Sequence, residues 1–593
     1  MTREKVVHLG DFTLRPGVLR IVAWAVPIGA AGALAALALL RLIGLLTNLV
    51  FYQQLSTRLT APGAGHHHAA LILLAPIAGG LIVGLMARYG SEKIRGHGMP
   101  EAIEAILTRG SRVEPRVAIL KPISAAVSIG TGGPFGAEGP IIMTGGAVGS
   151  VIAQTRHMSA DERKTLLVAG AAAGMAATFN APLASVLLAV ELLLFEWRPR
   201  SLVPVVTAVV TSTLLRAPLI GSGPLFPMPL SHLHLTSVAE LLCAPAGAVG
   251  GLLAIAATGL VYASEDAFSR LPLHWMWWPA VGGAVIGIGG LIEPRALGVG
   301  YAVIDQLLTG RAGLSLIIGI LVVKTLIWGL SLGSGTSGGV LAPVFMIGGA
   351  LGALEGHILP GVTPGFWALI GLSAVVGGVM RSPLTGIVFP LELTHAWPLL
   401  LALLIASTTA FLVSALLLKR SVLTEKIARR GLHLSREYAV DPLEVLFVDE
   451  VMHRTPVVAG ADEPLAALRQ RADLGRQWLY PVTDDDAALL GVIPRRALID
   501  LDGDALARAS DVAQPAALTV FGDETLRELA RRFASAHLTT AVVLLRSDPS
   551  RIAGLITVED LLQGHLRDLV YERQRERVLR PQVALRRRSV EAG

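Results

Sequence analysis

Cysteine and charge are both scarce in this chain. It has one cysteine among 593 residues, so no disulfide framework can form within it. Charged residues make up 16% and hydrophobic residues 53%, which excludes an ordinary soluble protein and a disordered one. No nucleic-acid motif accompanies the net charge of +6, and the apolar region has no nucleophile–base pair or metal-ligand cluster. These absences argue against an enzyme, a metalloprotein and a nucleic-acid-binding protein.

Long runs without a charged residue fill much of the chain before about residue 430. A bilayer-spanning helix needs about 20 largely apolar residues, so such runs can cross or re-enter a membrane. The first apolar segment, from about residue 19 to 51, is too long for a cleavable signal peptide. Basic residues gather where spans should end, which favours the cytoplasm for those ends and for both termini. The longest charge-free runs are 325–354, 358–380 and 396–418.

A single acidic residue stands inside a glycine-rich stretch of this region. Glu138 is the one charge between Gly130 and Pro140, and a similar run extends from Gly333 to Pro343. A carboxylate in hydrocarbon typically marks an ion or proton pathway, and irregular backbone survives there only where it lines a cavity. Both runs lead into apolar segments whose helical N-termini would carry about half a positive charge. Neither run contains lysine or arginine, so backbone N–H groups would bind an anion there.

The membrane region contains an internal duplication. Residues 121–149 align without gaps on residues 324–352, and further along Glu191 falls on Glu392. Short, interrupted apolar segments in corresponding halves predict a transporter-like site between the halves. The match of Glu191 with Glu392 favours a structural role for both, such as capping.

Charge density rises from about residue 435 onward, which predicts a soluble region. This region holds two similar units, at about 448–500 and 511–563. Each has the pattern of a short apolar strand, an amphipathic helix, two β-rich strands and a closing helix. We therefore expect a repeated α/β module after the membrane domain.

These features resemble the chloride channel and transporter family known as CLC. Three glycine motifs of that family have counterparts here in matching order, at Gly96–Pro100, Gly136–Pro140 and Gly339–Pro343. The soluble region is similar to a pair of CBS motifs, which commonly follow this membrane domain. The resemblance implies an all-α multi-span membrane fold, an inverted repeat of broken helices, followed by a soluble α/β CBS pair.

The resemblance also divides the chain into segments. The membrane domain is expected to contain two repeats, at about 19–216 and 236–432. The expected segments are a cytoplasmic N-terminal segment (1–18), the membrane domain (19–432), a linker (433–447), CBS motif 1 (448–504), CBS motif 2 (505–570) and a basic tail (571–593).

The site residues that the resemblance implies centre on Glu138. It matches the gating glutamate of the family, whose carboxylate fills the anion site when charged and leaves it when protonated or displaced. Lys121 matches a basic position that acts electrostatically. The backbone amides that match the anion ligands of the family belong to Gly96, His97, Ala137, Glu138, Gly139, Val340 and Leu341.

Three family ligands are replaced in this chain. His97 stands at the position of the central serine, Leu423 is the best match to the central tyrosine, and Leu192 stands where exchangers carry a second glutamate. Two hydroxyl donors are therefore lost. His97 is either a polar cap facing cytosolic water or an imidazole that replaces the serine hydroxyl and makes anion entry pH-dependent. The leucine at this position weakens the case for proton coupling without excluding it. Glu196, five residues after Glu191, is an alternative internal proton acceptor.

The sequence predicts membrane transport of chloride or similar monovalent anions, in each subunit of a homodimer. A passive channel is slightly favoured by Leu192 and the missing hydroxyls, and an anion/proton antiporter, supported by Glu138, is the alternative. The expected partners are small anions, protons in the antiporter, membrane lipid and a second copy of the chain, in a bacterial inner membrane. No cofactor is required. The CBS pair either binds an adenine nucleotide, with Thr557 and Asp560 as its contacts, or serves as a dimerisation module without ligand.

Overall fold

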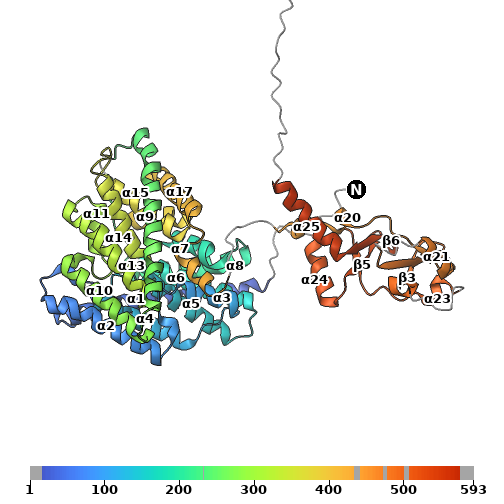
Figure 1. The fold of residues 1–593 in the computed structure, drawn as a ribbon, viewed down its shortest axis with the longest axis horizontal. Coiled ribbons are helices and arrows are strands. Elements are labelled where there is room, and N and C mark those ends of the chain that lie inside the picture. The colour runs from blue at the N-terminus through green and yellow to red at the C-terminus, as the bar shows by residue number, and fades with distance from the viewer. Residues whose placement is uncertain (1–15, 231–232, 433–440, 472–476, 500–506, 574–593) are drawn as a thin grey trace, which may run out of the picture. The chain divides into compact units, whose positions relative to one another are not determined.

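The computed structural model describes residues 16–230, 233–432, 441–471, 477–499 and 507–573. These fall into two compact units, one within residues 12–438 and one within 439–593 (Figure 1). Most of the expected N-terminal segment, the first part of the expected linker and nearly all of the basic tail lie outside the described residues. Each unit is described by itself.

The first unit is built from helices, and it contains the whole apolar region. Its first half comprises α1 (Val18–Thr47), α2 (Ala69–Tyr89), α3 (Met99–Thr108), α4 (Pro115–Gly130), α5 (Glu138–Gln154), α6 (Ala160–Phe179), α7 (Pro182–Ala189) and α8 (Pro199–Leu219). Its second half comprises α9 (Ser237–Ser269), α10 (Trp278–Ile292), α11 (Tyr301–Leu308), α12 (Leu314–Gly319), α13 (Thr325–Gly333), α14 (Leu341–Glu355), α15 (Phe366–Met380), α16 (Pro383–Thr394), α17 (Leu400–Leu417) and α18 (Val422–Arg429).

Helix length separates two classes of apolar helix in this unit. Seven helical stretches among the described residues are long and apolar enough to cross a membrane. Four further apolar stretches are shorter. Pro182–Leu194 and Pro383–Thr394 correspond to interrupted segments expected from the sequence. Leu341–Glu355 and Phe366–Met380 fall largely in the charge-free runs 325–354 and 358–380, which therefore do not form single span-length helices.

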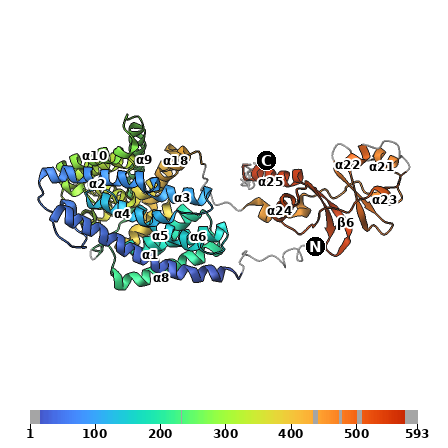
Figure 2. The ribbon, with the colours of Figure 1, turned by 90° about the horizontal axis from the view of Figure 1, so that it is seen from below.

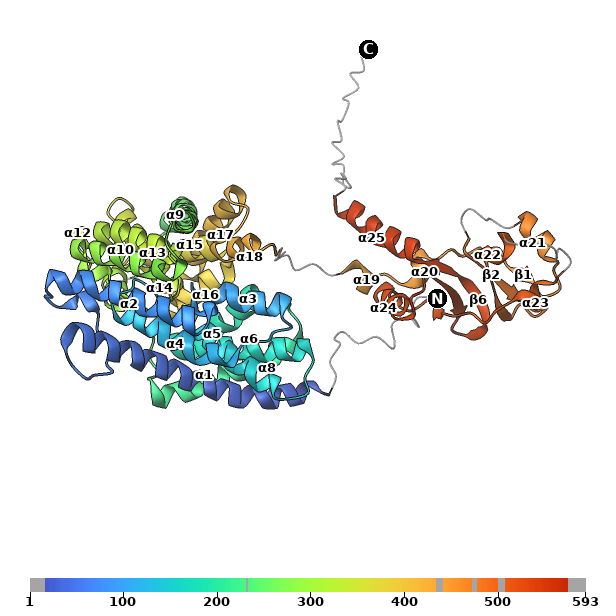
Figure 3. The same cartoon turned by 60° about the horizontal axis from the view of Figure 1, so that its bottom comes forward.

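The two halves repeat the same packing. Helix α5 packs along α6, and α14 packs along α15. Glycines permit this close approach: a Cβ on Gly145 would lie 2.2 Å from the Gly170 carbonyl oxygen, and one on Gly348 would lie 2.6 Å from that of Gly371. Helix α1 packs along α6 and α8, and Figures 2 and 3 show α8 beside α1. In the second half, α9 packs along α15 and α17 in the same way.

Helices α7 and α16 show how the halves are oriented. The Glu191 carboxylate, just after α7, accepts hydrogen bonds from Leu384 and Thr385 at the start of α16. Near the end of α16, Glu392 accepts bonds from Leu183 and Ala184 at the start of α7, at 2.9 and 2.7 Å. The end of each helix therefore meets the start of its counterpart, so the equivalent helices are antiparallel. This is the geometry of an inverted repeat.

The second unit contains two three-stranded sheets of the same topology. In each sheet the strands lie side by side in chain order. The first strand pairs parallel with the second, and the second pairs antiparallel with the third. The first half contains α20 (Val448–Val451), β1 (Ala459–Gly460), α21 (Leu465–Arg471), β2 (Leu479–Thr483), β3 (Leu489–Pro494) and α22 (Arg495–Ile499), after the short α19 (Pro442–Val445). The second half contains α23 (Ala509–Val512), β4 (Thr519–Phe521), α24 (Leu526–Ala536), β5 (Thr540–Leu545), β6 (Asp548–Thr557) and α25 (Val558–Arg573).

Candidate functional site

The two glycine-rich loops meet inside the helical unit. Gly339 donates its N–H to the carbonyl oxygen of Gly136 at 2.8 Å, and Gly136 donates in return at 3.3 Å. Helix α5 begins two residues after Gly136, and α14 begins two residues after Gly339. The positive ends of two helix dipoles are therefore brought to one point, where they favour negative charge.

The Glu138 side chain occupies this point. It is fully buried, and its Oε1 accepts a hydrogen bond from the backbone N–H of Ala342 at 2.6 Å. The N–H groups of Leu341 and of Glu138 itself also act on the carboxylate. Its Oε2 is buried and has no hydrogen-bond partner among the described residues. The carboxylate thus takes the place that an anion would take against the amides of α14.

The expected amide donors of the second loop need one addition. The sequence pointed to Val340 and Leu341, and the structure places them at the start of α14. A hydrogen bond to the carboxylate comes from Ala342, one residue further on. The N–H groups of a helix's first turn have no partner within the helix, so three consecutive amides are available here.

A third loop, Gly96–Gly98, touches the same point. The Gly96 N–H donates a hydrogen bond to the Thr336 carbonyl oxygen at 3.0 Å, which connects this loop to the segment that precedes α14. A Cβ on Gly139 would lie 1.8 Å from the His97 carbonyl oxygen, so the loop approaches the start of α5 closely. His97 is buried, and its Nδ1 has no hydrogen-bond partner among the described residues. The structure therefore brings all three expected loops together.

Lys121 lies in this region but points its charge at the backbone. Its Nζ donates to the carbonyl oxygens of Ile94 and Gly96 at 2.8 and 2.7 Å, and the residue is fully buried. Lys324, its counterpart in the repeat, donates in the same way to Ala296 and Gly298, both at 2.8 Å. Each lysine thus holds a glycine loop in place, in addition to its electrostatic effect.

Comparisons with known proteins bear on this geometry. The family model described as voltage gated chloride channel matches residues 79–415, more than half of the chain. The chain belongs to this family. The CBS domain model matches residues 448–504 and 509–566. The predicted family and fold class are therefore confirmed, and the chain is a multi-pass membrane protein of the CLC family followed by CBS domains.

Relatives of known name lie within the CLC family. The chain is 30% identical over 372 residues to a putative chloride channel protein ClcB-like from Ralstonia nicotianae, with 60% of this chain and 85% of the relative covered. It is 32% identical over 369 residues to the H(+)/Cl(-) exchange transporter ClcA of Citrobacter koseri, with 58% and 75% covered. A slow cyanobacterial Cl−/H+ antiporter has a similar fold, with a TM-score of 0.60, 22% identity and 70% of this chain and 99% of that chain covered.

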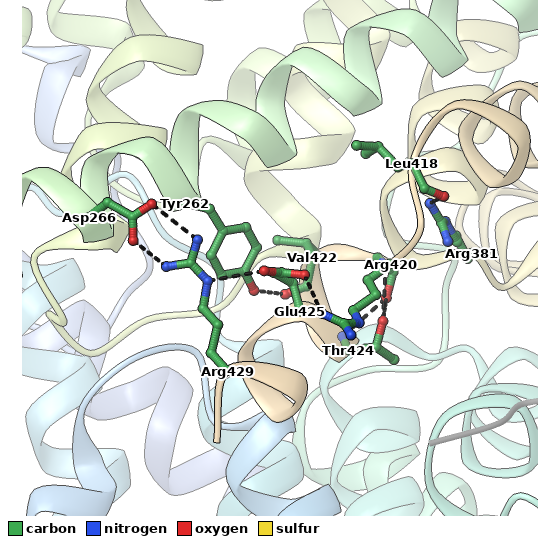
Figure 4. Close-up of polar contacts among 10 residues, drawn as sticks. Tyr262, Asp266, Arg381, Leu418, Arg420, Val422, Thr424, Glu425 and Arg429 are labelled. Atoms are coloured by element: carbon green, nitrogen blue, oxygen red, sulfur yellow. Dashed lines mark hydrogen bonds and ion pairs between the residues drawn. The ribbon is translucent and has the colours of Figure 1, made fainter. Parts of the chain in front are cut away.

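Two of the three positions that depart from the CLC pattern carry buried apolar side chains. Leu192 is almost fully buried after α7, and Leu423 is fully buried on α18. Polar bonds hold α18 in place (Figure 4): the Tyr262 hydroxyl of α9 donates to the Val422 carbonyl, and Arg429 binds Asp266 of α9 at 3.2 Å. The side chain at position 423 is therefore apolar and offers no hydroxyl.

A charged cavity adjoins the Gly96–Gly98 loop. It has a volume of about 890 Å³, and His97 forms part of its wall. Both signs of charge line it, with Glu101 paired to Lys426 at 3.2 Å and to Arg430 at 3.0 Å. We call this cavity the vestibule. The basic groups of its wall are thus partly neutralised by carboxylates.

Thr557 and Asp560 lie together at the end of β6. The Thr557 N–H and hydroxyl both donate to the Asp560 carboxylate, at 2.8 and 2.7 Å, and the Asp560 N–H donates back to the hydroxyl at 3.2 Å. These bonds cap the start of α25. The sequence pair is thus formed, and its polar groups already satisfy one another.

Three residues of the site did not emerge from the sequence as site residues. Ala342 was overlooked because the family pattern directed attention to the two residues before it. Lys324 had a signal, since it aligns with Lys121 in the duplication. Tyr301 had only its place beside the second-repeat loop Gly298–Gly300, where the carboxylate of Glu138 acts electrostatically on its hydroxyl.

Proposed function

We propose that the chain exchanges chloride or a similar monovalent anion for protons across the membrane, with Glu138 as gate and proton carrier. The observation that carries this proposal is the buried Glu138 carboxylate, which accepts the Ala342 N–H where the two glycine loops meet. The amides that would bind the anion are those of His97, Ala137, Glu138, Gly139, Val340 and Leu341, together with Ala342. The expected Gly96 amide is not among them, because its N–H already donates to the Thr336 carbonyl oxygen.

The physical argument is competition for the same donors. A charged carboxylate and an anion cannot share these N–H groups, because like charges at contact repel strongly in a low-dielectric site. When Glu138 takes up a proton, its charge and most of its attraction to the amides are lost. The side chain can then leave, and an anion can replace it. Proton uptake and anion entry are thereby linked at one residue.

The named relatives support the antiporter better than the passive channel. A relative at 32% identity carries the name H(+)/Cl(-) exchange transporter, whereas the name of the one at 30% is that of a putative chloride channel. The slight preference for a channel that the sequence alone suggested is therefore reversed in this proposal.

A passive channel remains the second candidate because of Leu192. An exchanger must deliver protons to Glu138 from the other side of the membrane, and Leu192 places a buried apolar side chain where exchangers carry a glutamate. Glu196 is an acidic alternative nearby, but Ser201 donates a hydrogen bond to it and Arg200 lies 3.6 Å away. These contacts engage the Glu196 carboxylate within the fold.

Reversal potentials separate the two candidates. Purified full-length protein is placed in liposomes with a fixed chloride gradient, and a pH gradient is then imposed. Exchange predicts that the reversal potential moves with the pH gradient and that proton flux accompanies chloride flux. A reversal potential that stays at the chloride equilibrium value for every pH gradient would establish the passive channel instead.

Further expectations accompany this function. We propose a homodimer with one pathway in each subunit, in a bacterial inner membrane, with both termini in the cytoplasm. We also propose that the CBS pair regulates transport, with adenine nucleotide as a candidate ligand at Thr557 and Asp560, and that the chain has no enzymatic activity. Crosslinking of the full-length protein in membranes tests the dimer, and nucleotide titration of the same protein tests the ligand.

A further inference from the structure

A second, smaller cavity lies at the start of α11, and the proposed gate does not use it. Its volume is about 80 Å³, and residues 298–302 form one wall while Thr47 and Thr60 contribute to another. It shares no lining residue with the vestibule. The volume is enough for one small ion or a few waters.

The loop at this cavity repeats the backbone of the Gly96–Gly98 loop. Gly298 and Gly300 have φ values of +68° and +86°, close to the +74° and +87° of Gly96 and Gly98. These left-handed values favour glycine at all four positions. A buried lysine holds each loop through two carbonyl oxygens, Lys324 here and Lys121 there. The chain therefore builds the same loop twice, and a helix follows each copy.

Tyr301 adds a donor that the first loop lacks. It is the first residue of α11, and its ring packs edge-on against Phe179 and Phe226, with centroids 6.5 and 5.7 Å away. Its hydroxyl oxygen is buried and has no hydrogen-bond partner among the described residues. A buried, unpaired hydroxyl is unfavourable and calls for a ligand or a water.

Two polar groups near this loop lie within electrostatic reach of Glu138. The carboxylate of Glu138 acts electrostatically on the Tyr301 hydroxyl and on the Lys324 ammonium. The first N–H groups of α11 have no partner within the helix, because Val303 is the first residue whose N–H bonds back, to Gly300. A hydroxyl, helix-end amides and a buried ammonium are thus gathered beside the gate.

We propose that the Tyr301 hydroxyl and the first amides of α11 bind one halide-sized anion, at a position we call the α11 subsite. The inference rests on the proposed transport function and adds a binding step to it. An anion held there is poised to enter when Glu138 leaves, and its charge repels the Glu138 carboxylate. The same hydroxyl could instead hold only a water molecule, which is an outcome of the test.

Bromide provides the direct probe, because its anomalous scattering identifies it. Crystals of the full-length protein grown in sodium bromide should show a peak within hydrogen-bond distance of the Tyr301 Oη. Tyr301→Phe keeps the ring and its aromatic packing, so the peak should vanish without loss of the fold. Tyr262→Phe is the matched control, because it deletes a hydroxyl that is bonded to Val422 and lines the vestibule instead. The peak at Tyr301 should persist in that variant.

The outcomes separate this inference from the proposed function. Bromide at the amides of His97 or Leu341, with only water at Tyr301, would overturn the α11 subsite and leave the proposed function standing. Bromide at none of these positions, in crystals of the wild type and of Glu138→Gln alike, would count against both. A Tyr301 peak that survives in Tyr301→Phe would show that the hydroxyl does not hold the anion.

Transport kinetics give a second, independent readout. Loss of one hydrogen bond to an anion should raise the half-saturating chloride concentration on one face of the membrane about three- to ten-fold, with maximal flux retained. A merely structural role for Tyr301 would lower maximal flux and protein yield instead. Half-saturation unchanged on both faces in Tyr301→Phe would contradict the proposal.

Discussion

At the scale of single residues, the burial of Glu138 raises the question of how a carboxylate is tolerated there. It lies away from water, yet it has the Ala342 N–H and the starts of α5 and α14 around it. Amide dipoles stabilise the negative charge without a permanent counter-charge in contact with it. Such a site can release its occupant, because no full positive charge holds it.

Neutralising Glu138 tests its double role. Glu138→Gln removes the charge and the titratable proton while it keeps the side-chain volume, so we expect proton flux to fall at least about ten-fold. Anion flux should continue and lose its pH dependence, because the amides are no longer blocked by charge. Liposome flux assays that record chloride and protons together provide the measurement.

A half-buried glutamate at the other end of α14 supplies the control. Glu355 lies at the far end of α14 and also has a buried carboxylate oxygen without a partner among the described residues. Glu355→Gln should keep both the proton flux and its pH dependence. Equal effects of the two substitutions would show that proton coupling does not belong to Glu138.

Lys121 and Lys324 occupy equivalent positions in the two repeats, so replacing either should lower the stability of the protein by a similar amount. Replacing either with methionine leaves two buried carbonyl oxygens without their donor, which should cost about 2–4 kcal/mol. Thermal unfolding of the detergent-solubilised protein should show similar decreases for both variants. If Lys324→Met were as stable as the wild type, the lysine would not be needed to hold the Gly298–Gly300 loop.

Part of the site was predictable at this scale, and part was not. Glu138 stood out because a lone charge among glycines and apolar residues is costly, and the duplication directed attention to the second loop. The bond from Ala342 and the proximity of Tyr301 to Glu138 depend on how separate segments come together. Neither leaves a periodicity or spacing in the sequence that could reveal it.

At the scale of helices, α7 and α16 cap each other. Glu191 and Glu392 accept the N–H groups at the start of the opposite helix, which fits the structural role that their match in the duplication favoured. These hydrogen bonds engage Glu191 in the fold. Its neighbour, Leu192, stands at the position where exchangers carry their second glutamate. The caps therefore join the two repeats.

Replacing either glutamate by glutamine should loosen this contact. A glutamine offers one acceptor where the carboxylate offers two, so each variant should lose about 1–2 kcal/mol of stability. Thermal unfolding measures the loss, and the ratio of protons to anions transported should stay that of the wild type. A Glu191→Gln variant of normal stability that no longer moves protons would instead identify Glu191 as the internal proton acceptor.

Helix α21 in the soluble unit carries a pH-dependent contact. Arg471 binds the Glu463 carboxylate, with Nε to Oε1 at 2.7 Å, and this hydrogen bond holds the pKa of Glu463 below its usual value. Because the folded-state pKa is lowered, the contact stabilises the fold above the unfolded pKa of about 4.3. The stabilisation is lost as the pH falls through the lower folded-state value.

Hydrogen exchange of β2 and β3 in the full-length protein measures this effect. Because Arg471 is largely exposed, Glu463→Gln should cost less than about 1 kcal/mol at pH 7. The difference between variant and wild type should shrink below about pH 4, where the carboxylate takes up its proton. A difference that grows as the pH falls would contradict the sign of this argument.

At the scale of the whole chain, the fold was largely predictable from the sequence. The charge-free run 396–418 located a span-length helix, whereas 325–354 is broken between α13 and α14 and 358–380 contains only the shorter α15. The alignment of residues 121–149 on 324–352 revealed the repeat. The inverted orientation needed the family resemblance, since a repeat alone does not fix direction. The antiparallel pair of α7 and α16 now shows it directly. The small cavity beside Tyr301 was not predictable, because it arises where residues from both repeats meet.

The central claim is that Glu138 fills an anion site formed by the two glycine loops. Bromide-containing crystals of the full-length Glu138→Gln variant test this most directly. We expect an anomalous peak within hydrogen-bond distance of the Ala342 amide nitrogen, where the wild-type carboxylate oxygen lies, and no such peak in the wild type at neutral pH. Absence of bromide from that position in the variant, with the loops still paired through Gly136 and Gly339, would contradict the claim.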